Sequence, residues 1–232
     1  MNPKNEIKQG DPHTGAFGIT GGGKTTAIKR MIKASKRLAV WDVMEDIGQK
    51  DKRPFIHPVD RKAMLSAFKS CYRGKPMRIA YQPEKKNRDK LFHDFCRNLM
   101  SFQQLYYDAY KKGNHKPELV LDVVIDELDT VYPRHVGFDH PFSELVRRGR
   151  HYGIRLIGAT QFPTTVNSDF RRNCSISYLF PLGAEGPSFV QSAYKNKQAS
   201  DLIKTLPNHS AIVLETGAPE PWIYQNPPLK NG

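Results

Sequence analysis

The fold is decided by one glycine-rich stretch, which reads Gly18-Ile19-Thr20-Gly21-Gly22-Gly23-Lys24-Thr25. This octapeptide satisfies GxxxxGK[ST], the pattern of a phosphate-binding loop. It stands between a short apolar stretch, Gly15 to Ile19, which we expect to form a strand, and a helical pattern from Lys24 to about Ala34. Because the phosphate-binding mechanism needs a strand, a loop and a helix in this order, the sequence predicts a nucleotide site here.

The loop also predicts how a nucleotide is held. Glycines let consecutive backbone N–H groups turn toward phosphates, and the positive end of the following helix points at the same charge. Lys24 is expected to reach the β and γ phosphates, and the Thr25 hydroxyl to ligate Mg²⁺, with Thr26 the less favoured ligand. A flexible glycine turn with a solvent-exposed lysine is the alternative. The predicted cofactors are therefore ATP and Mg²⁺, and the predicted binding residues are Thr20, Gly21, Gly22, Gly23, Lys24, Thr25 and Thr26.

Two adjacent carboxylates end a later apolar stretch, Val123-Val124-Ile125-Asp126-Glu127. A doubly wound sheet places its ligand crevice at such strand ends. Asp126 is expected to hold Mg²⁺ directly or through water, and Glu127 to accept the proton of an attacking water, which favours hydrolysis. A solvated strand end is the alternative for Glu127, while Asp122 is expected to make a structural hydrogen bond and Asp129 to lie at the surface.

The rest of the chain alternates between strand and helix patterns. We therefore predict an α/β fold with a mainly parallel central sheet flanked by helices and a C-terminal β-hairpin. Residues 1–13 are predicted to be a flexible tail and residues 14–232 one domain. The predicted strands are Arg37–Asp42, Met77–Tyr81, Leu119–Ile125, Ile154–Ala159, Ser175–Phe180 and the hairpin Ser210–Leu214 with Pro221–Tyr224; the predicted helices are Asp60–Ser70, Asp89–Lys112, Pro141–His151 and one within Pro187–Leu206.

Composition narrows the class of protein. The 232 residues carry a formal net charge of +13, an excess that favours polyanions such as nucleic acid or an acidic membrane surface. No stretch approaches the roughly 20 apolar residues that a membrane helix needs, so we expect an intracellular chain without a membrane span. Cys71, Cys96 and Cys174 have no CxxC spacing, which favours reduced thiols over a zinc site.

A third motif adds a family resemblance. The run GRHYGIRLIGATQFP, from Gly149 to Pro163, resembles the GRxxGIxLxxATQxP segment of the FtsK/HerA superfamily of ring-forming DNA translocases. The glycine loop and the apolar stretch that ends in Asp126 and Glu127 match the same superfamily. Within it the chain looks most similar to the short packaging ATPases of membrane-containing bacteriophages and their A32-like relatives, so the resemblance implies the RecA/FtsK-like variety of P-loop NTPase, the ASCE class.

The resemblance also implies function and site residues. Gln161 would sense the γ-phosphate or position water, and an arginine would reach the nucleotide of a neighbouring subunit, with Arg150 preferred and Arg147 or Arg148 in reserve. The implied protein is an ATPase that assembles as a ring, expected to be a hexamer, and translocates double-stranded DNA into a preformed capsid. Capsid vertex or portal proteins would be its partners, and it would act in the host cell cytoplasm or on the virion at the packaging vertex.

The DNA contacts are expected in two loops. Lys85, Lys86, Arg88 and Lys90 precede the long predicted helix, and Arg134 follows the acidic strand end. Exposed basic loops suit phosphate contacts without base reading, although a solvated helix entrance explains the same charges. Other functions stay open: a P-loop kinase for small molecules, a filamentous-phage assembly ATPase of the zonular-occludens-toxin type, or a binding module switched by nucleotide.

Overall fold

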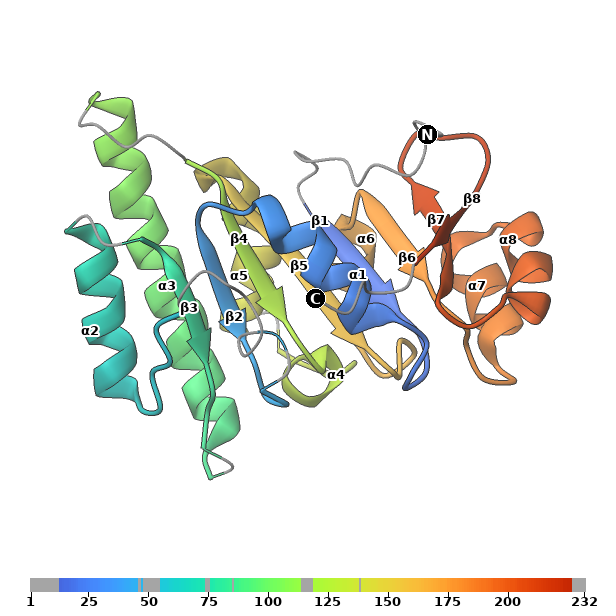
Figure 1. Cartoon of the computed structure of the whole chain (residues 1–232), viewed down its shortest axis with the longest axis horizontal. Coiled ribbons are helices and arrows are strands. Elements are labelled where there is room, and N and C mark those ends of the chain that lie inside the picture. The colour runs from blue at the N-terminus through green and yellow to red at the C-terminus, as the bar shows by residue number, and fades with distance from the viewer. Residues whose placement is uncertain are drawn as a thin grey trace, which may run out of the picture.

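The computed structural model describes residues 13–45, 47, 55–73, 76–84, 86–113, 119–137 and 139–226 (Figure 1). Its centre is an eight-stranded sheet in the order β3-β2-β4-β5-β1-β6-β7-β8. All neighbours from β3 to β6 pair in parallel, and β7 and β8 are added antiparallel. The strands are β1 (His13–Phe17), β2 (Leu38–Trp41), β3 (Arg78–Tyr81), β4 (Leu121–Ile125), β5 (Ile154–Thr160), β6 (Ile176–Leu179), β7 (Ser210–Glu215) and β8 (Trp222–Gln225).

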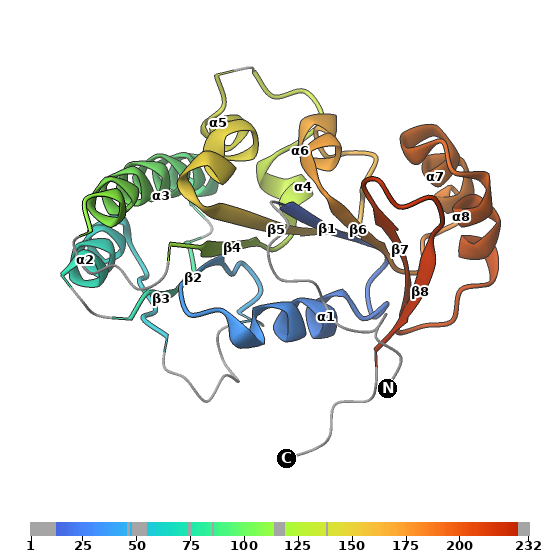
Figure 2. The ribbon, with the colours of Figure 1, turned by 90° about the horizontal axis from the view of Figure 1, so that it is seen from above.

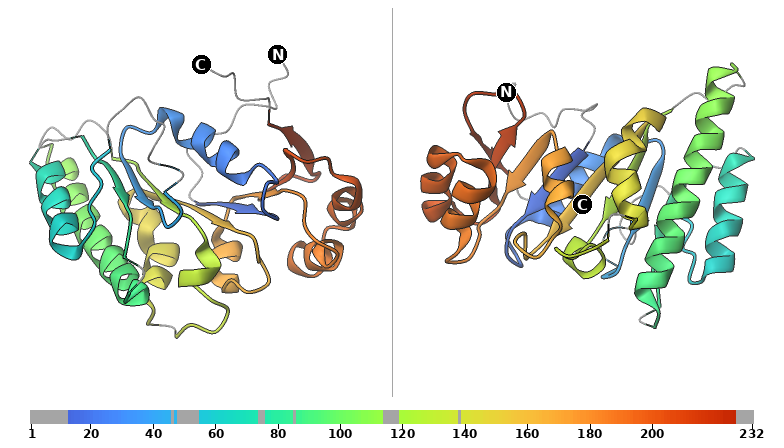
Figure 3. Two further views of the ribbon diagram at one scale, coloured as in Figure 1. Left: turned by 60° about the horizontal axis from the view of Figure 1, so that its bottom comes forward. Right: turned by 180° about the vertical axis from the view of Figure 1, so that it is seen from behind.

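Helices cover both faces of this sheet. Figure 2 shows α1 on one face and α3, α5 and α6 on the other, while α7 and α8 lie beside the hairpin of β7 and β8. Seen from behind, α2 and α3 stand side by side at the β3 edge (Figure 3). The helices are α1 (Lys24–Met31, then a 3-10 turn Ile32–Ala34), α2 (Arg61–Tyr72), α3 (Arg88–Lys111), α4 (Leu128–Val131), α5 (Pro141–Arg148, then a 3-10 turn Gly149–Tyr152), α6 (Ser168–Asn173), α7 (Gly186–Tyr194) and α8 (Lys197–Leu202, then a 3-10 turn Ile203–Thr205).

The apolar strands are buried on both sides because both faces carry helices. In β4, Val123 and Ile125 pack into the core under α3 and α5, whereas Val124 packs into the core under α1. Alternate residues of one strand thus belong to two cores, which explains why the stretch is continuously aliphatic instead of alternating. Asp122 interrupts this aliphatic stretch, and two contacts offset the cost of burying its carboxylate. Arg155 Nε donates to one oxygen over 2.5 Å, and the Ser35 hydroxyl donates to the other. The expected structural role of Asp122 is confirmed.

The predicted fold class is confirmed, including the mainly parallel sheet and the closing hairpin. Two short helices, α4 and α6, were not predicted, because four to six residues are too few to show a helical period. The single helix predicted within Pro187–Leu206 is instead two helices, α7 and α8. His13, predicted to end the tail, is the buried first residue of β1. The three cysteines are free and buried, and no helix of the described part of the chain is long and apolar enough to cross a membrane.

Candidate nucleotide-binding site

Three strand ends bring the predicted site residues to one edge of the sheet. The glycine loop follows β1, the acidic pair Asp126 and Glu127 follows β4, and Gln161 follows β5. Since β5 lies between β4 and β1 and all three are parallel, their carboxyl ends open into one crevice. The topology therefore joins the glycine loop to two segments that come more than a hundred positions later in the chain.

The loop is held closely against the neighbouring strands. The Gly18 N–H donates to the Thr160 carbonyl at 3.2 Å, and the Ile19 N–H donates to the Pro181 carbonyl at 2.9 Å. A side chain at Gly18 would approach the Cβ of Phe180 to 2.6 Å, which explains the glycine at this position. The loop starts in a fixed place because both of its first N–H groups are anchored.

Lys24 lies over this loop. Its ammonium donates to the carbonyl of Gly18 at 2.7 Å and to the carbonyl of Ile19 at 3.0 Å. Burial holds the pKa of Lys24 below its ordinary value, and the nearby carboxylates of Glu127, Asp126 and Asp129 act in the opposite direction by favouring the charged form. The lysine therefore faces all three acidic groups of the β4 end.

A chain of hydrogen bonds joins the loop to the acidic pair. The Thr20 hydroxyl donates to Gln161 Oε1 at 2.5 Å, and Gln161 Nε2 donates to Glu127 Oε1 at 2.8 Å. Glu127 has a left-handed backbone, with φ 50°, at the start of α4, and its carbonyl accepts from the backbone N–H of Thr130 at 3.0 Å. The orientation of all three side chains is thus mutually fixed.

Asp126 and Thr25 supply the oxygen donors that a magnesium ion prefers. Asp126 is buried, and its N–H donates to the carbonyl of Trp41 on β2. Thr25 is the second residue of α1 and is partly buried. A hydroxyl and a carboxylate at this edge fit Mg²⁺, and the described residues contain no group of three or more His, Cys, Asp or Glu side chains that points to another metal.

One residue of this region differs from its prediction. Asp129 was expected at the surface, but it is half-buried and accepts a hydrogen bond from the Thr160 hydroxyl at 2.5 Å. The same hydroxyl accepts from the N–H of Phe162 at 2.9 Å. Asp129 therefore fixes the end of β5 from which Gln161 projects, a role that only the position of α4 reveals.

Arg150 precedes β5, at the opposite end of that strand from Gln161, and the other two arginines are the last residues of α5. Arg147 pairs with Asp169 of α6, and Arg148 lies 3.3 Å from Glu144 one turn earlier in α5. Arg150 is exposed, and its guanidinium has no hydrogen bond or ion pair within the described ranges. Because Arg150 precedes the seven residues of β5 and Gln161 follows them, the two are separated by about 23 Å of strand.

The predicted DNA contacts lie at the same edge as the glycine loop. Lys86 and Lys90 are exposed and Arg88 is partly exposed at the start of α3, which follows the end of β3. Arg134 is exposed in the turn after α4. Lys85 lies outside the described residues. The two loops follow different strands, yet both border the crevice edge.

The C-terminal hairpin adds contacts that the sequence did not indicate. Asn226 Nδ2 donates to the Gly23 carbonyl at 2.9 Å, and the His209 N–H donates to the Gly22 carbonyl at 3.2 Å. No local pattern marks either residue, because each reaches the loop through the strand order alone. The hairpin therefore contacts the loop at Gly22 and Gly23, whereas Gln161 contacts it at Thr20.

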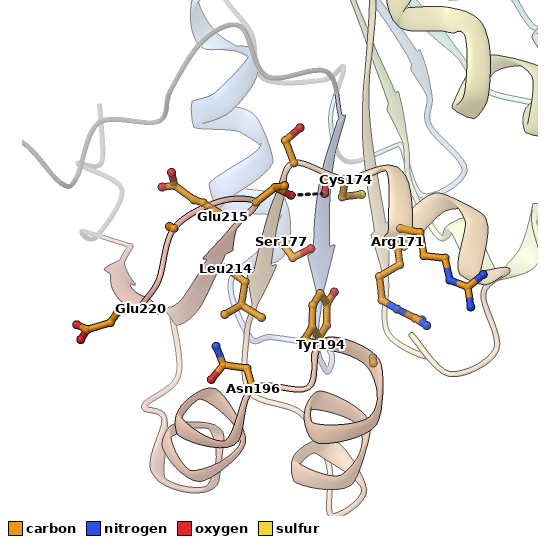
Figure 4. Close-up of a pocket in the computed structure, with 13 residues that line it drawn as sticks. Arg171, Cys174, Ser177, Tyr194, Asn196, Leu214, Glu215 and Glu220 are labelled. Carbon is orange, nitrogen blue, oxygen red and sulfur yellow. Dashed lines mark hydrogen bonds between the residues drawn. The ribbon is translucent and has the colours of Figure 1, made fainter.

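A separate cavity of about 350 Å³ lies away from this crevice. Figure 4 shows Tyr194 rising from the end of α7 between Arg171 and Ser177, with Glu220 pointing outward at the rim. The cavity is lined by Ser175 before β6 and Thr216 after the antiparallel β7, so it opens at the edge opposite the glycine loop. It takes no part in the nucleotide site.

The fold and these strand ends together define a P-loop NTPase architecture. In a mainly parallel sheet, β1 leads into GxxxxGKT, the neighbouring β5 is followed by Gln161, and β4 beyond it is followed by Asp126 and Glu127. No protein-family model matches the chain. In sequence the chain is 26% identical, over 188 residues, to Protein P9 of Pseudoalteromonas phage PM2, covering 78% of this chain and 76% of that protein.

Solved structures agree with this class. The genome packaging NTPase B204 from Sulfolobus turreted icosahedral virus 2, in complex with AMPPCP, aligns with a TM-score of 0.69 at 17% identity over 95% of this chain and 99% of that chain. VirB4 of Thermoanaerobacter pseudethanolicus aligns with a TM-score of 0.63 at 11% identity, over 96% of this chain and 92% of its own. The expected resemblance to viral packaging ATPases is borne out as a structural likeness, and at 17% and 11% identity this likeness shows the fold.

Proposed function

We propose that this chain is a Mg²⁺-dependent ATPase that forms a ring and drives double-stranded DNA into a viral capsid. The observation that best supports ATP hydrolysis is the chain of hydrogen bonds from Thr20 through Gln161 to Glu127. It connects the phosphate-binding loop to a carboxylate placed for hydrolysis. A loop that only bound nucleotide would not need a carboxylate held in this way.

Glu127 is the proposed general base. Its Oε1 accepts from Gln161, whereas its Oε2 has no hydrogen bond within the described ranges and is left to accept the proton of a water. Gln161 would place that water, since its amide is fixed at both ends. The proton moves from water to Glu127 as the water oxygen bonds to the γ phosphorus and ADP leaves.

The loop residues hold the substrate. Lys24 would exchange its bonds to the Gly18 and Ile19 carbonyls for the β and γ phosphate oxygens, and the N–H groups from Thr20 to Thr26 would surround the phosphates. Thr25 and Asp126 would hold Mg²⁺, which neutralises charge on the phosphates during transfer.

The DNA motor is supported by the relatives and by charge. Structures similar to this chain include a viral genome packaging NTPase, and the formal net charge of +13 favours a polyanion.

Arg150 is too far from the Gln161 of its own chain to serve it, so we propose that it reaches the nucleotide of the next subunit in a ring, expected to be a hexamer. Lys86, Arg88, Lys90 and Arg134, with Lys85, are the proposed backbone contacts to DNA. Capsid vertex or portal proteins are the proposed partners, in the host cytoplasm or at the virion vertex.

The test is phosphate release from Mg-ATP with and without linear double-stranded DNA, at low and at moderate salt. We expect stimulation by DNA that weakens as salt rises, because backbone contacts release counterions. Glu127→Gln and Arg150→Ala should each be inactive, and mixing them should restore activity, because a mixed ring contains sites with an intact Glu127 beside an intact Arg150.

Arg148→Ala is the comparison variant, since it removes another exposed arginine, two positions away, which lies beside Glu144 of its own helix. DNA-independent hydrolysis would contradict the motor, and transfer of phosphate to a small acceptor would replace it with a kinase. Failure of the two inactive variants to complement each other would remove the subunit-bridging role of Arg150.

A further inference from the structure

The C-terminal hairpin touches the glycine loop at a second place, far from the acidic pair. Asn226, directly after β8, donates through Nδ2 to the Gly23 carbonyl at 2.9 Å, and its Oδ1 accepts from Arg30 of α1 at 2.7 Å. The Tyr224 hydroxyl also donates to Oδ1, at 2.9 Å. In Figure 2 the end of β8 comes down beside the start of α1, on the same face of the sheet. Asn226 therefore connects the loop, the helix that follows it and the last strand.

His209 sits beside Asn226 on the turn before β7. Its backbone is left-handed, with φ 64°, its N–H donates to the Gly22 carbonyl, and its own carbonyl accepts from the Asn226 N–H at 2.8 Å. The His209 side chain is exposed, and its ring has no hydrogen bond within the described ranges. This fixed backbone presents an exposed imidazole beside the glycine loop, with its Nδ1 close to Gly23.

Gly23 shows how close the hairpin comes. A Cβ at this position would lie 2.8 Å from Asn226 Nδ2, 3.2 Å from the His209 Cα and 3.3 Å from the His209 Nδ1. With φ 105°, Gly23 also occupies backbone space that other residues avoid. The hairpin is packed against the loop backbone itself, so the loop and the hairpin form one continuous surface.

The direction of a bound nucleotide follows from the two ends of the loop. Thr20 marks the terminal-phosphate end because it contacts Gln161, which contacts Glu127. The hairpin contacts the other end, at Gly22 and Gly23. A triphosphate lying along the loop with its last phosphate at Glu127 therefore directs its nucleoside toward His209.

We propose that the β7–β8 hairpin forms the nucleoside side of the site, with the His209 ring contacting the base and Asn226 fixing the Gly23 peptide as a positioning residue. The inference rests on the proposed nucleotide site and assigns it a part that the motifs do not include. The two residues have separable roles: His209 recognises the nucleoside, and Asn226 holds the phosphate cradle in shape.

Calorimetric binding of two magnesium-loaded probes separates these roles. AMPPCP carries a nucleoside, whereas inorganic tripolyphosphate carries none. His209→Ala should weaken AMPPCP binding by roughly two- to tenfold, the range of a ring contact, and leave tripolyphosphate binding unchanged. Asn226→Asp loses the donor to Gly23 and sets a carboxylate against its carbonyl, so both probes should bind about tenfold more weakly.

Two neighbouring positions supply matched controls. Gln225→Glu makes the same amide-to-carboxylate change on an exposed side chain one residue earlier, and Asn208→Ala truncates the exposed residue before His209. Neither should change either affinity. Because His209 is on an exposed turn, its variant keeps the test decisive even where Asn226→Asp lowers the melting temperature.

Other results would overturn the proposal. Equal weakening of both probes by His209→Ala would mean that the ring only shapes the loop, and no weakening of AMPPCP would remove the nucleoside contact. A wild-type chain that binds neither probe would overturn the proposed function as well. Hydrolysis without DNA stimulation, together with the expected pattern for the two probes, would reject the motor and leave this inference standing.

Discussion

Replacing Gln161 by alanine removes the bridge between the glycine loop and Glu127. The amide donates to a carboxylate over 2.8 Å, and hydrogen bonds to charged groups contribute about 1.5–3 kcal/mol. If this bond is needed fully in the transition state, its loss lowers kcat by about 10- to 150-fold, at about 1.4 kcal/mol for each factor of ten. Thr20→Val removes the neutral bond to Gln161 Oε1, worth about 0.5–1.5 kcal/mol, and should lower kcat by about 2- to 10-fold.

Phosphate release at saturating Mg-ATP measures both effects, with KM recorded for each variant. Since the two bonds act in series on Glu127, the double variant Thr20→Val with Gln161→Ala should be no slower than Gln161→Ala alone. Thr164→Val makes the same change as Thr20→Val on an exposed residue and should be neutral. Fully additive losses, or a rise in KM with unchanged kcat, would refute the relay that connects the loop to Glu127.

Three further substitutions test the stability of the fold and its dependence on pH. Asp122→Asn breaks a buried ion pair with Arg155 and should lower the free energy of unfolding by about 3 kcal/mol in urea denaturation, whereas an unchanged midpoint would mean that the pair is neutral. Gly158→Ala would place a methyl group 2.5 Å from the buried Phe170 ring, so the melting temperature should fall, and an unchanged value would show that the ring moves freely. Burial, aided by a second histidine, lowers the pKa of His140 to about 4, so the unfolded chain binds an extra proton as pH falls from 6.5 toward 4 and stability decreases over that window. His140→Phe should flatten this part of the curve of melting temperature against pH, and two parallel curves would contradict it.

Local patterns predicted most of the elements because their signals are contained in short stretches. The glycine loop, the apolar run before Asp126 and the period of the helix over Arg88–Lys111 each identify their own structure. The same patterns placed Asp126 and Gln161 at strand ends and Lys24 at the start of the helix after the glycine loop, and the parallel topology then brings these positions together. What the sequence could not supply was the strand order, which puts β5 between β4 and β1 and so allows Gln161 to touch both Thr20 and Glu127.

Contacts made by residues without a motif were not predictable. Asp129 looks like any exposed acid beside an acidic pair, yet α4 turns it toward Thr160. The arginines show the same limit: all three share one basic run, but α6 supplies Asp169 to Arg147 and none of the described residues pairs with Arg150. Whether an arginine already has an ion-pair partner depends on how the neighbouring helices pack. The sequence alone could therefore not show which arginine is left for another role.

Gly23 shows why the motif alone understates the site. The pattern GxxxxGK asks for this glycine because the backbone must curl around phosphate, and that reason needs only the loop itself. The structure adds a second reason. Asn226, 203 positions later in the chain, donates to the Gly23 carbonyl, and its amide lies in the space that a side chain at Gly23 would need. A substitution at Gly23 therefore disturbs the phosphate cradle and the hairpin contact together. If such a variant lost nucleotide binding, the loss could not be assigned to either one. Variants of the hairpin leave the loop sequence intact, so they are the changes that can separate the two roles.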